Sequence, residues 1–335
     1  MLHRIIVTLP AAAVILSLAS GQNPKSDGSY GEGTAFGPFG VPLTRYNELL
    51  NSPNATSQYP LLGPNISAPY PGSGNILNGW SWVVSVAADI PLSESNSTTA
   101  DWYPDNHNHN HTFTGSRVVL QQAPTTGPPA HESWFVCVVN WDIDLATYPS
   151  KLRTDDGSCS SVLSEQCIRD TEASVLEEYR LGLGGPNPCK CPSLTEIASC
   201  EGEQAKALMS GGGCAAGPFN ATAIRNWPDG KLDVRQFGGP PHKARNLTAY
   251  NETGSLAWPV LAVWGPSTNN TRNSTGQIDF SGAVAKLSCV RAKDATPGSK
   301  TPGGGTVSVG NREAVVSSTI LVASVVWVGS WVAFL

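Results

Sequence analysis

Three histidines at alternating positions are the side chains best suited to metal chemistry in this chain of 335 residues. His107, His109 and His111 are separated by asparagines. In an extended strand, side chains at i, i+2 and i+4 lie on one face, so the three imidazoles would point together. Imidazole binds copper and zinc well, and the spacing therefore predicts a surface metal site. The alternative, which we favour, is a glycosylated turn, because Asn110 begins a sequon and a turn alone does not fix ligand geometry.

Paired carboxylates would be needed to cleave a glycosidic bond, one as acid and the other as nucleophile or base. The best pair is Asp142 and Asp144, which follow an apolar run ending at Trp141. They share a strand face, and Trp141 could stack on a sugar ring. Residues two apart on one strand are poorly placed to flank a bond from opposite sides, however, and aspartates at strand ends usually cap turns.

The other motifs that carry chemistry are absent or incomplete. Glu177 and Glu178 are adjacent on an expected helix and face different directions, as on a solvated helix face. The chain has no Gly-x-Ser-x-Gly elbow for a serine nucleophile and no Gly-x-Gly-x-x-Gly loop for a nucleotide. Cys189 and Cys191 have no second cysteine pair with histidines nearby, so zinc is disfavoured. The sequence therefore predicts no catalytic residue and no cofactor.

Cysteine usage indicates an oxidising compartment. The chain has eight cysteines, an even count that predicts up to four disulfides. Seven of them lie between positions 137 and 214, which predicts a stapled insert in the middle of the chain. We expect Cys137 to pair with Cys289, because both lie in strand-like runs, and the other six to pair within the insert. The cysteines are Cys137, Cys159, Cys167, Cys189, Cys191, Cys200, Cys214 and Cys289.

Glycosylation signals and charge agree with that compartment. Charged residues make up 14% of the chain, against roughly 25% in ordinary soluble domains, so glycans would supply much of the solubility. The net charge is -5 and no basic run exists, which gives nucleic-acid binding no electrostatic support. The nine Asn-x-Ser/Thr sequons begin at Asn54, Asn65, Asn96, Asn110, Asn220, Asn246, Asn251, Asn269 and Asn273.

The N-terminal residues have the features of a secretory signal. The apolar run 5–18 follows His3 and Arg4, and small residues allow cleavage after Ala19 or Gly21. Residues 1–20 are therefore predicted to be a signal peptide, with a buried N-terminal helix as the alternative. Residues 21–40 are rich in Gly, Ser and Pro and are expected to be a flexible segment.

The C-terminal residues predict a membrane anchor. Residues 314–335 are apolar or small and uncharged, and a polar spacer precedes them at 306–313. Gly304 and Gly305, with Ser308 behind them, provide the small residues of a GPI attachment site. A single membrane-spanning helix is the alternative, although it would usually carry basic flanking residues. Residues 293–313 are expected to be a flexible stalk.

Apolar periodicity predicts a mainly β protein with a helical insert, an α+β fold. Runs of β-branched and aromatic residues at 80–90, 117–121, 134–141, 258–264 and 284–290 predict strands. Apolar residues recur with helical spacing over 158–179, and shorter helices are expected at 194–200 and 203–209. We predict a β-sandwich-like domain, 41–155 and 249–292, that carries a disulfide-rich helical insertion at 156–248. A separate small disulfide module is the alternative.

One cysteine pattern resembles a known group of proteins. The run from Asp155 to Cys167, followed by Cys189 and Cys200, is similar to secreted, GPI-anchored, cysteine-rich fungal glycoproteins of unknown function. The similarity extends through residues 258–264 to Cys289. The resemblance implies a fungal source and a setting at the cell wall or plasma membrane. It carries no assigned activity and no functional residues.

The sequence thus predicts a non-catalytic glycoprotein on the outer face of the plasma membrane or in the cell wall. A structural or interaction role is the leading hypothesis, with the membrane contacted through the lipid anchor or a single C-terminal helix. An anchored enzyme or binding module acting on cell-wall polysaccharide is the first alternative. A surface metal-binding protein that uses the three histidines is the second.

Overall fold

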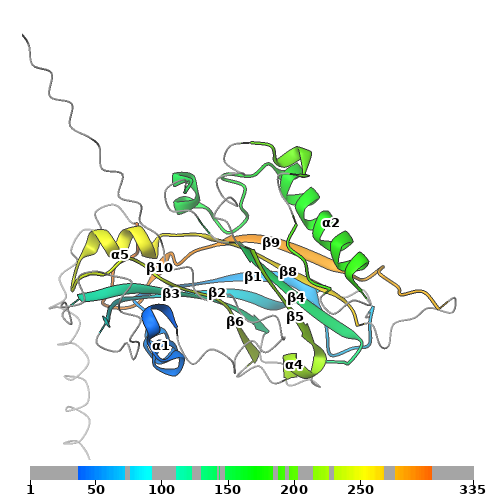
Figure 1. The fold of residues 1–335 in the computed structure, drawn as a ribbon, viewed down its shortest axis with the longest axis horizontal. Helices are drawn as coiled ribbons and strands as arrows, with labels where there is room; N and C mark the ends of the chain where they lie inside the picture. The colour runs from blue at the N-terminus through cyan, green and yellow to red at the C-terminus, as the bar shows by residue number, and fades with distance from the viewer. Residues whose placement is uncertain are drawn as a thin grey trace, which may run out of the picture.

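The computed structural model describes residues 37–71, 76–92, 111–122, 130–141, 143, 148–183, 188–192, 196–202, 214–225, 230–267 and 276–303. These residues are mainly β and form two antiparallel sheets (Figure 1). The mainly β expectation is therefore confirmed.

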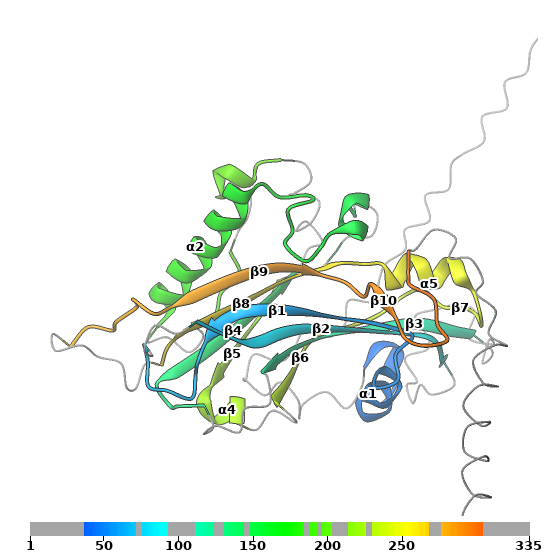
Figure 2. The same cartoon turned by 180° about the vertical axis from the view of Figure 1, so that it is seen from behind.

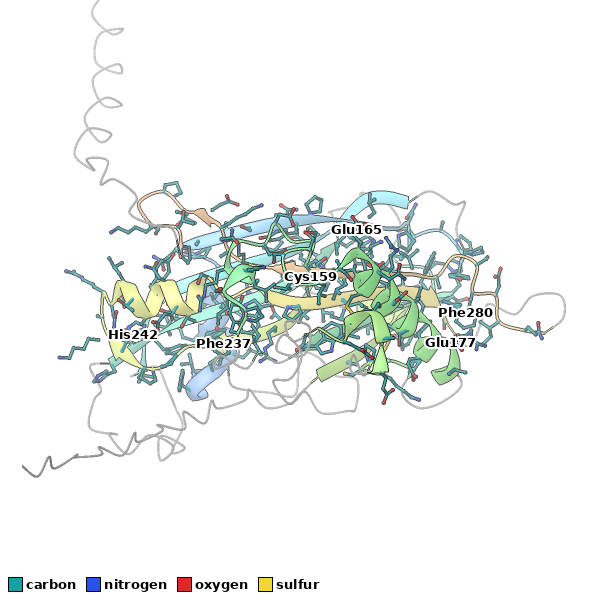
Figure 3. The ribbon with its side chains drawn as sticks, turned by 90° about the horizontal axis from the view of Figure 1, so that it is seen from above. Cys159, Glu165, Glu177, Phe237, His242 and Phe280 are labelled. Atoms are coloured by element: carbon teal, nitrogen blue, oxygen red, sulfur yellow. A yellow bond between two sulfur atoms is a disulfide. The ribbon has the colours of Figure 1, made fainter. Side chains whose placement is uncertain are left out.

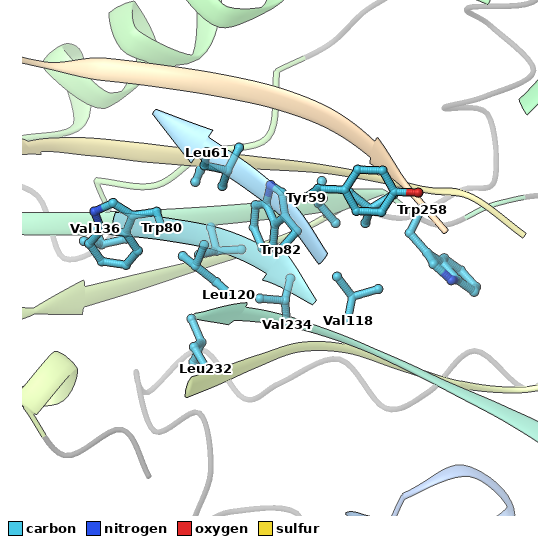
Figure 4. Packing of buried hydrophobic residues seen from close by; sticks show 14 of the residues in the cluster. Tyr59, Leu61, Trp80, Trp82, Val118, Leu120, Val136, Leu232, Val234 and Trp258 are labelled. Atoms are coloured by element: carbon cyan, nitrogen blue, oxygen red, sulfur yellow. The ribbon is translucent and has the colours of Figure 1, made fainter. Parts of the chain in front are cut away.

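The first sheet has the strand order β10, β1, β2, β3, β6, and β7 also pairs with β3. Successive side chains of a strand point to opposite faces, and the pairs β1–β2, β2–β3 and β3–β6 each have one register shift. Tyr59, Trp82, Leu120 and Leu232 are register partners across four strands, and all are buried on one face (Figure 4). The strands are β1 (Ala55–Pro64), β2 (Ile76–Pro91), β3 (His111–Gln122), β6 (Lys231–Gly238), β7 (His242–Lys243) and β10 (Asp294–Ala295).

The second sheet is covered on both faces. Its order is β5 (Cys214–Asn220), β4 (Trp134–Trp141), β8 (Trp258–Pro266) and β9 (Val284–Val290). Every residue of β8 is buried. Trp258 and Trp264 pack with the first sheet, whereas Leu261 and Val263 pack with the helix α2 on the other side. A strand covered on both faces needs apolar residues at consecutive positions, which explains why β8 has no polar side chain.

The two sheets share one apolar core, the central cluster, which includes Trp80, Trp82, Val136, Trp258 and Trp264. The ring centroids of Trp80 and Trp264, from different sheets, lie 5.3 Å apart in an edge-to-face arrangement. Aromatic pairs of this kind add about 0.5–1.5 kcal/mol to the free energy gained from burial alone. Six tryptophans of the described residues are buried, as expected for core residues.

The helix α2 (Glu165–Gly182) lies over β9 on the outer side of the second sheet (Figures 1 and 2). Glu172 accepts a hydrogen bond from the backbone N–H of Leu287 at 3.0 Å and pairs with Lys286 at 3.3 Å. Tyr179 donates to the carbonyl of Pro266 at 2.7 Å. The helix therefore covers the free edge of β9, where unpaired N–H groups would otherwise face solvent.

The observed helix begins later than the predicted start at 158. The carboxylate of Asp155 accepts hydrogen bonds from the backbone N–H groups of Gly157, Cys159 and Ser161, which holds these residues in a loop. Ser164 then caps the helix by accepting from the N–H of Cys167.

The other helices are short. Of the shorter helices expected, the described part of 194–200 contains the 3-10 turn Ala198–Cys200, and 203–209 lies outside the described residues. The first sheet carries α1 (Leu43–Leu50) on the side opposite α2 (Figures 1 and 2). The remaining short helices among the described residues are α4 (Ala221–Arg225), α5 (Leu247–Gly254) and the 3-10 turns Pro38–Gly40 and Ser150–Thr154.

The predicted insert boundaries, 156–248, include strands of both sheets. Residues 214–220 form β5 and pair with β4, and residues 231–238 form β6 and pair with β3. The strand β5 contains mainly small residues, Gly and Pro, so its sequence lacks the β-branched signal. In β6, Leu232 and Val234 are the only aliphatic residues, and both face the central cluster. The hydrophobic pattern of these two segments is therefore too weak to predict a strand from the sequence.

The predicted pairing of Cys137 with Cys289 is wrong. Among the described residues, three disulfides join Cys137 to Cys189, Cys159 to Cys289 and Cys167 to Cys200. Cys191 is also disulfide-bonded. Cys137 lies in β4 and Cys289 in β9, with β8 between them. Two strand spacings are about 10 Å, beyond the Cα separation of about 4.4–6.8 Å that a disulfide spans. The segments that contain Cys189 and Cys159 are therefore bonded to β4 and β9, respectively.

The described part of the predicted stalk is packed against the domain, and residues 304–313 lie outside the described residues. Residues 293–303, here called the C-terminal segment, pack against β1 and α5. Its strand β10 pairs with β1, and Tyr250 donates to the carbonyl of Lys300 at 2.7 Å. The N–H of Gly303 donates to the side-chain oxygen of Asn251 at 3.2 Å. These contacts hold a sequence whose composition suggested a flexible linker.

We expect loss of the Cys159–Cys289 bond to destabilise the protein most among the three disulfides. This bond closes a loop of 130 residues, against 33 for Cys167–Cys200. On the chain-entropy model the two bonds contribute about 5 and about 4 kcal/mol. Urea unfolding of the two double Cys→Ser variants compares them, and non-reducing peptide mapping identifies the pairs. A peptide linking Cys137 to Cys289 would contradict this structure.

Removing the C-terminal segment should also destabilise the domain. A secreted form that ends at residue 292 loses the pairing of β10 with β1 and the hydrogen bonds of Tyr250 and Asn251. We expect its free energy of unfolding to fall by on the order of 1 kcal/mol or more, relative to a control that ends at residue 303. Equal urea midpoints for the two forms would mean that this segment is a free stalk after all.

Candidate functional site

The structure describes one of the three predicted metal-binding histidines. His111 is the first residue of β3, and its Nδ1 is buried without a hydrogen-bond partner among the described residues. His107 and His109 lie outside the described residues. Within the part of the chain that is described, no group of three or more His, Cys, Asp or Glu side chains could hold a metal ion. The histidine site stays a prediction.

The carboxylates weighed for glycoside hydrolysis fall into two groups. Asp142 and Asp144 lie outside the described residues. Glu177 is exposed on α2 and forms an ion pair with Arg180, whose hydrogen bond lowers the pKa of the Glu177 carboxyl. Figure 3 shows Glu177 on α2, far from His242 at the α5 end of the molecule. Glu177 therefore belongs to a solvated helix face, as predicted.

A serine and a histidine in contact form a turn and have no catalytic geometry. The Nδ1 atom of His131 lies 2.8 Å from Oγ of Ser133, two residues away. Ser133 is buried, and its Oγ accepts a hydrogen bond from the N–H of Tyr70 at 2.7 Å. A nucleophile needs an exposed hydroxyl, so this pair serves to join two loops.

Five of the nine predicted glycosylation sites are described, and four, Asn96, Asn110, Asn269 and Asn273, lie outside the described residues. Asn65, Asn220 and Asn246 are exposed, and each uses its side-chain oxygen to accept a nearby backbone N–H. Asn54 differs, because its amide nitrogen, where a glycan would attach, donates to Oγ of Ser299 at 3.2 Å. A glycan there would compete with the C-terminal segment for space.

The outer face of the first sheet, opposite the central cluster, carries a hollow of about 210 Å³ that sequence reasoning missed. We call it the sheet-face hollow. Its floor is formed by side chains of β1, β2 and β3, and α1 with the residues after it forms one wall. The lining residues are Leu50, Asn51, Pro53, Thr56, Val83, Ser85, Arg117, Val119, Gln121 and Lys231.

Strand register brings these side chains together. Thr56 is the register partner of Ser85, and Ser85 is the partner of Arg117. Because partners lie about 5 Å apart on one face, the three side chains form a polar row across the floor. Val83 and Val119 are also partners and form an apolar pair in the adjacent row, in which Asp233 is the partner of Val119. The hollow therefore offers a small apolar surface beside polar groups.

Arg117 is held in place by its neighbours. Its Nη2 donates to the side-chain oxygen of Asn51 at 3.2 Å, and its Nε lies 3.7 Å from a carboxylate oxygen of Asp233. Asp233 also accepts from the amide of Asn47 at 3.3 Å. The Arg117 side chain is only 12% exposed. These contacts fix the guanidinium beside the hollow before any ligand binds.

Burial raises the pKa of the Asp233 carboxyl, and the nearby Arg117 guanidinium offsets part of this rise. Because 38% of the Asp233 side chain is exposed, solvent limits the size of the effect. Residues 117–121 do not alternate, so the sequence contains one short signal for this face, the alternation of polar and apolar residues over 231–234. That pattern indicates a half-buried strand and says nothing about a hollow.

Comparison with known proteins finds no matching family model, no similar curated protein and no similar solved structure. In the part of the chain that is described, none of the helices is both long and apolar enough to cross a membrane. The disulfides are compatible with a secreted or extracellular protein.

The raised pKa of Asp233 should make part of the stability depend on pH. The folded protein holds this proton more tightly than the unfolded chain, so the contribution is present below the ordinary value of 3.8 and is lost as pH rises through the raised pKa. Urea unfolding from pH 3 to 7 should show the wild type losing stability relative to Asp233→Asn.

Asp279→Asn is the matched control, because hydrogen bonds from Ser281 lower the pKa of Asp279 and reverse the sign. If the wild type instead gains stability over Asp233→Asn as pH rises, attraction to Arg117 outweighs burial and our assignment is wrong.

Proposed function

We propose that this protein is a non-catalytic, GPI-anchored glycoprotein of the cell surface, with a structural or interaction role at the cell wall. The observation that carries the proposal is the disulfide framework. Among the described residues, three bonds connect β4, β9 and α2 to the cysteine-rich loops. Such bonds persist in oxidising, extracellular compartments and are rare in reducing ones.

Surface sequons support the same proposal. Asn65, Asn220 and Asn246 are exposed, and no described residue accepts a hydrogen bond from their amide nitrogens. Glycans at these positions would project into solvent without disturbing the apolar clusters. The resemblance to cysteine-rich fungal surface proteins supports the cell-wall setting.

We also propose that the fold is β-sandwich-like and carries a disulfide-rich helical insertion between β4 and β5. The central cluster, to which both sheets contribute side chains, supports the sandwich. The second apolar cluster, which combines α2 residues such as Val175 and Tyr179 with β8 residues such as Leu261, supports the insertion. The insertion would then act as a cover for the outer face of the second sheet.

The anchor proposal rests on sequence features of residues 304–335. We expect a tag fused after Leu335 to be absent from the mature protein, because the C-terminal tail is replaced by lipid. A tag placed after Gln22 should persist and be released from membranes by a phosphatidylinositol-specific phospholipase. A C-terminal tag retained on the surface form, with no release by the phospholipase, would identify a membrane-spanning helix instead.

Substitution of the attachment residues provides a second test. Replacing Gly304 and Gly305 with leucine should retain the protein inside the cell, unless Ser308 takes over, since attachment requires small side chains. Gly303 is left unchanged because its φ of 68° and its contact with Ser255 would strain any other residue there. A matched control replaces Gly202, an exposed position with open space around it.

A further inference from the structure

The sheet-face hollow contains polar groups that the protein itself does not use. Within the described residues, no hydrogen bond is made by Nη1 of Arg117, by Nζ of Lys231 or by the side-chain amide of Gln121. The hydroxyl of Ser85, on the floor between Thr56 and Arg117, is also without a partner there. Most of these groups are donors, so the hollow suits a ligand rich in acceptors.

The charges around the hollow favour an anionic ligand. Arg117 and Lys231 both line it, whereas the nearest carboxylate, Asp233, is not among the lining residues. Asp233 is itself occupied by Arg117 and Asn47. The hollow therefore presents one cation held in a fixed position and one on a mobile stem, and the Asp233 carboxylate that pairs with Arg117 lies beside the lining and offsets part of this positive charge.

The size and floor of the hollow favour a single sugar ring. Its volume of about 210 Å³ is below the roughly 300 Å³ at which pockets for drug-sized ligands begin. Val83, which is half-buried, gives the floor an apolar contact for the C–H face of a pyranose, with the buried Val119 beside it. Ser85 and Gln121 lie at opposite ends of this valine pair along the strands, where they could contact ring hydroxyls.

We propose that the sheet-face hollow binds a carboxylate-bearing sugar unit of an acidic glycan. Arg117 and Lys231 bind the carboxylate, Ser85 and Gln121 bind hydroxyl groups, and Val83 contacts the ring. Arginine pairs with carboxylate and phosphate groups alike, so the preference for a carboxylate rests on charge: Asp233, 3.7 Å from Arg117, repels a doubly charged phosphate group more strongly than a single carboxylate. The inference rests on the proposed surface role, since it names the ligand class that such a protein would meet.

The test measures binding directly, without reference to localisation or anchoring. Full-length protein, purified in detergent, is titrated by calorimetry with a tetramer of galacturonic acid and with the neutral tetramer of galactose. We expect the acidic tetramer to bind and the neutral one to bind at least about fivefold more weakly, because a solvent-exposed charge pair contributes up to about 1 kcal/mol. Raising the salt concentration from 50 to 200 mM should weaken binding.

Two charge reversals locate the site. Lys231→Glu should weaken binding of the acidic tetramer at least about fivefold. Lys243→Glu is the matched control, because this substitution changes the net charge by the same amount. Lys243 is exposed on β7 of the same sheet and lies outside the hollow. Circular dichroism and the thermal midpoint show whether each variant is folded. Gln121→Ala is a second probe, which removes a hydrogen bond without changing charge.

Several outcomes would overturn the proposal. These are absence of binding at millimolar acidic tetramer, equal binding of the neutral tetramer, or equal weakening by Lys231→Glu and Lys243→Glu. Tighter binding of galactose 6-phosphate than of galacturonic acid would assign the hollow to phosphate and overturn the carboxylate assignment. None of these results depends on whether the protein carries a lipid anchor, so the proposed function and this inference can fail separately.

Discussion

The covering of both faces of β8 is the constraint on which the rest of the structure depends. A strand in which Trp258, Val260, Leu261, Val263 and Trp264 are all buried is stable only if apolar groups lie above and below it. The first sheet supplies one cover, and α2 supplies the other. At the strand end, a side chain on Gly265 would collide with Tyr179, since a Cβ there would lie 2.4 Å from the ring. A methyl group at this position would therefore force Tyr179 to move.

The cysteine-rich loops follow from the same requirement. The helix reaches the outer face of the second sheet only because the chain leaves β4, passes over the sheet and returns as β5. Long loops of this kind lose much conformational entropy when they order. The bonds from Cys159 to Cys289 and from Cys137 to Cys189 join the loops to strands of the sheet that the helix covers. The backbone of Cys289 also donates to the carbonyl of Gly157 at 3.0 Å, which closes the edge of β9.

Sequence reasoning identified the parts of the fold that have a strong local signal. The strands with aromatic and β-branched residues, and the helix that includes Val175 and Tyr179, were predictable because their apolar residues recur with a fixed period. The strand β5 was not predictable, since Ala215, Ala216 and Gly217 have no β preference. They form a strand only because they pair with β4. The disulfide pairs were not predictable either, because they depend on the order of the strands in the sheet, which determines how far apart two cysteines lie. The sheet-face hollow requires register across several strands, and no local pattern contains that information.

Because the C-terminal segment is packed against the domain, its contacts determine how the domain would respond to a pulling force applied at residue 303. A pull on Gly303 first loads its hydrogen bond to Asn251, then the bond between Tyr250 and Lys300, and then the short pairing of β10 with β1. These contacts lie in series, so they break one at a time and the segment peels away. The load next reaches Cys289, whose covalent bond to Cys159 prevents β9 from being drawn out of the sheet. Extension therefore stops at the edge of the core, and β1, β2, β3 and β6 stay paired under a force that has already removed β10 and straightened the eleven residues from 293 to 303.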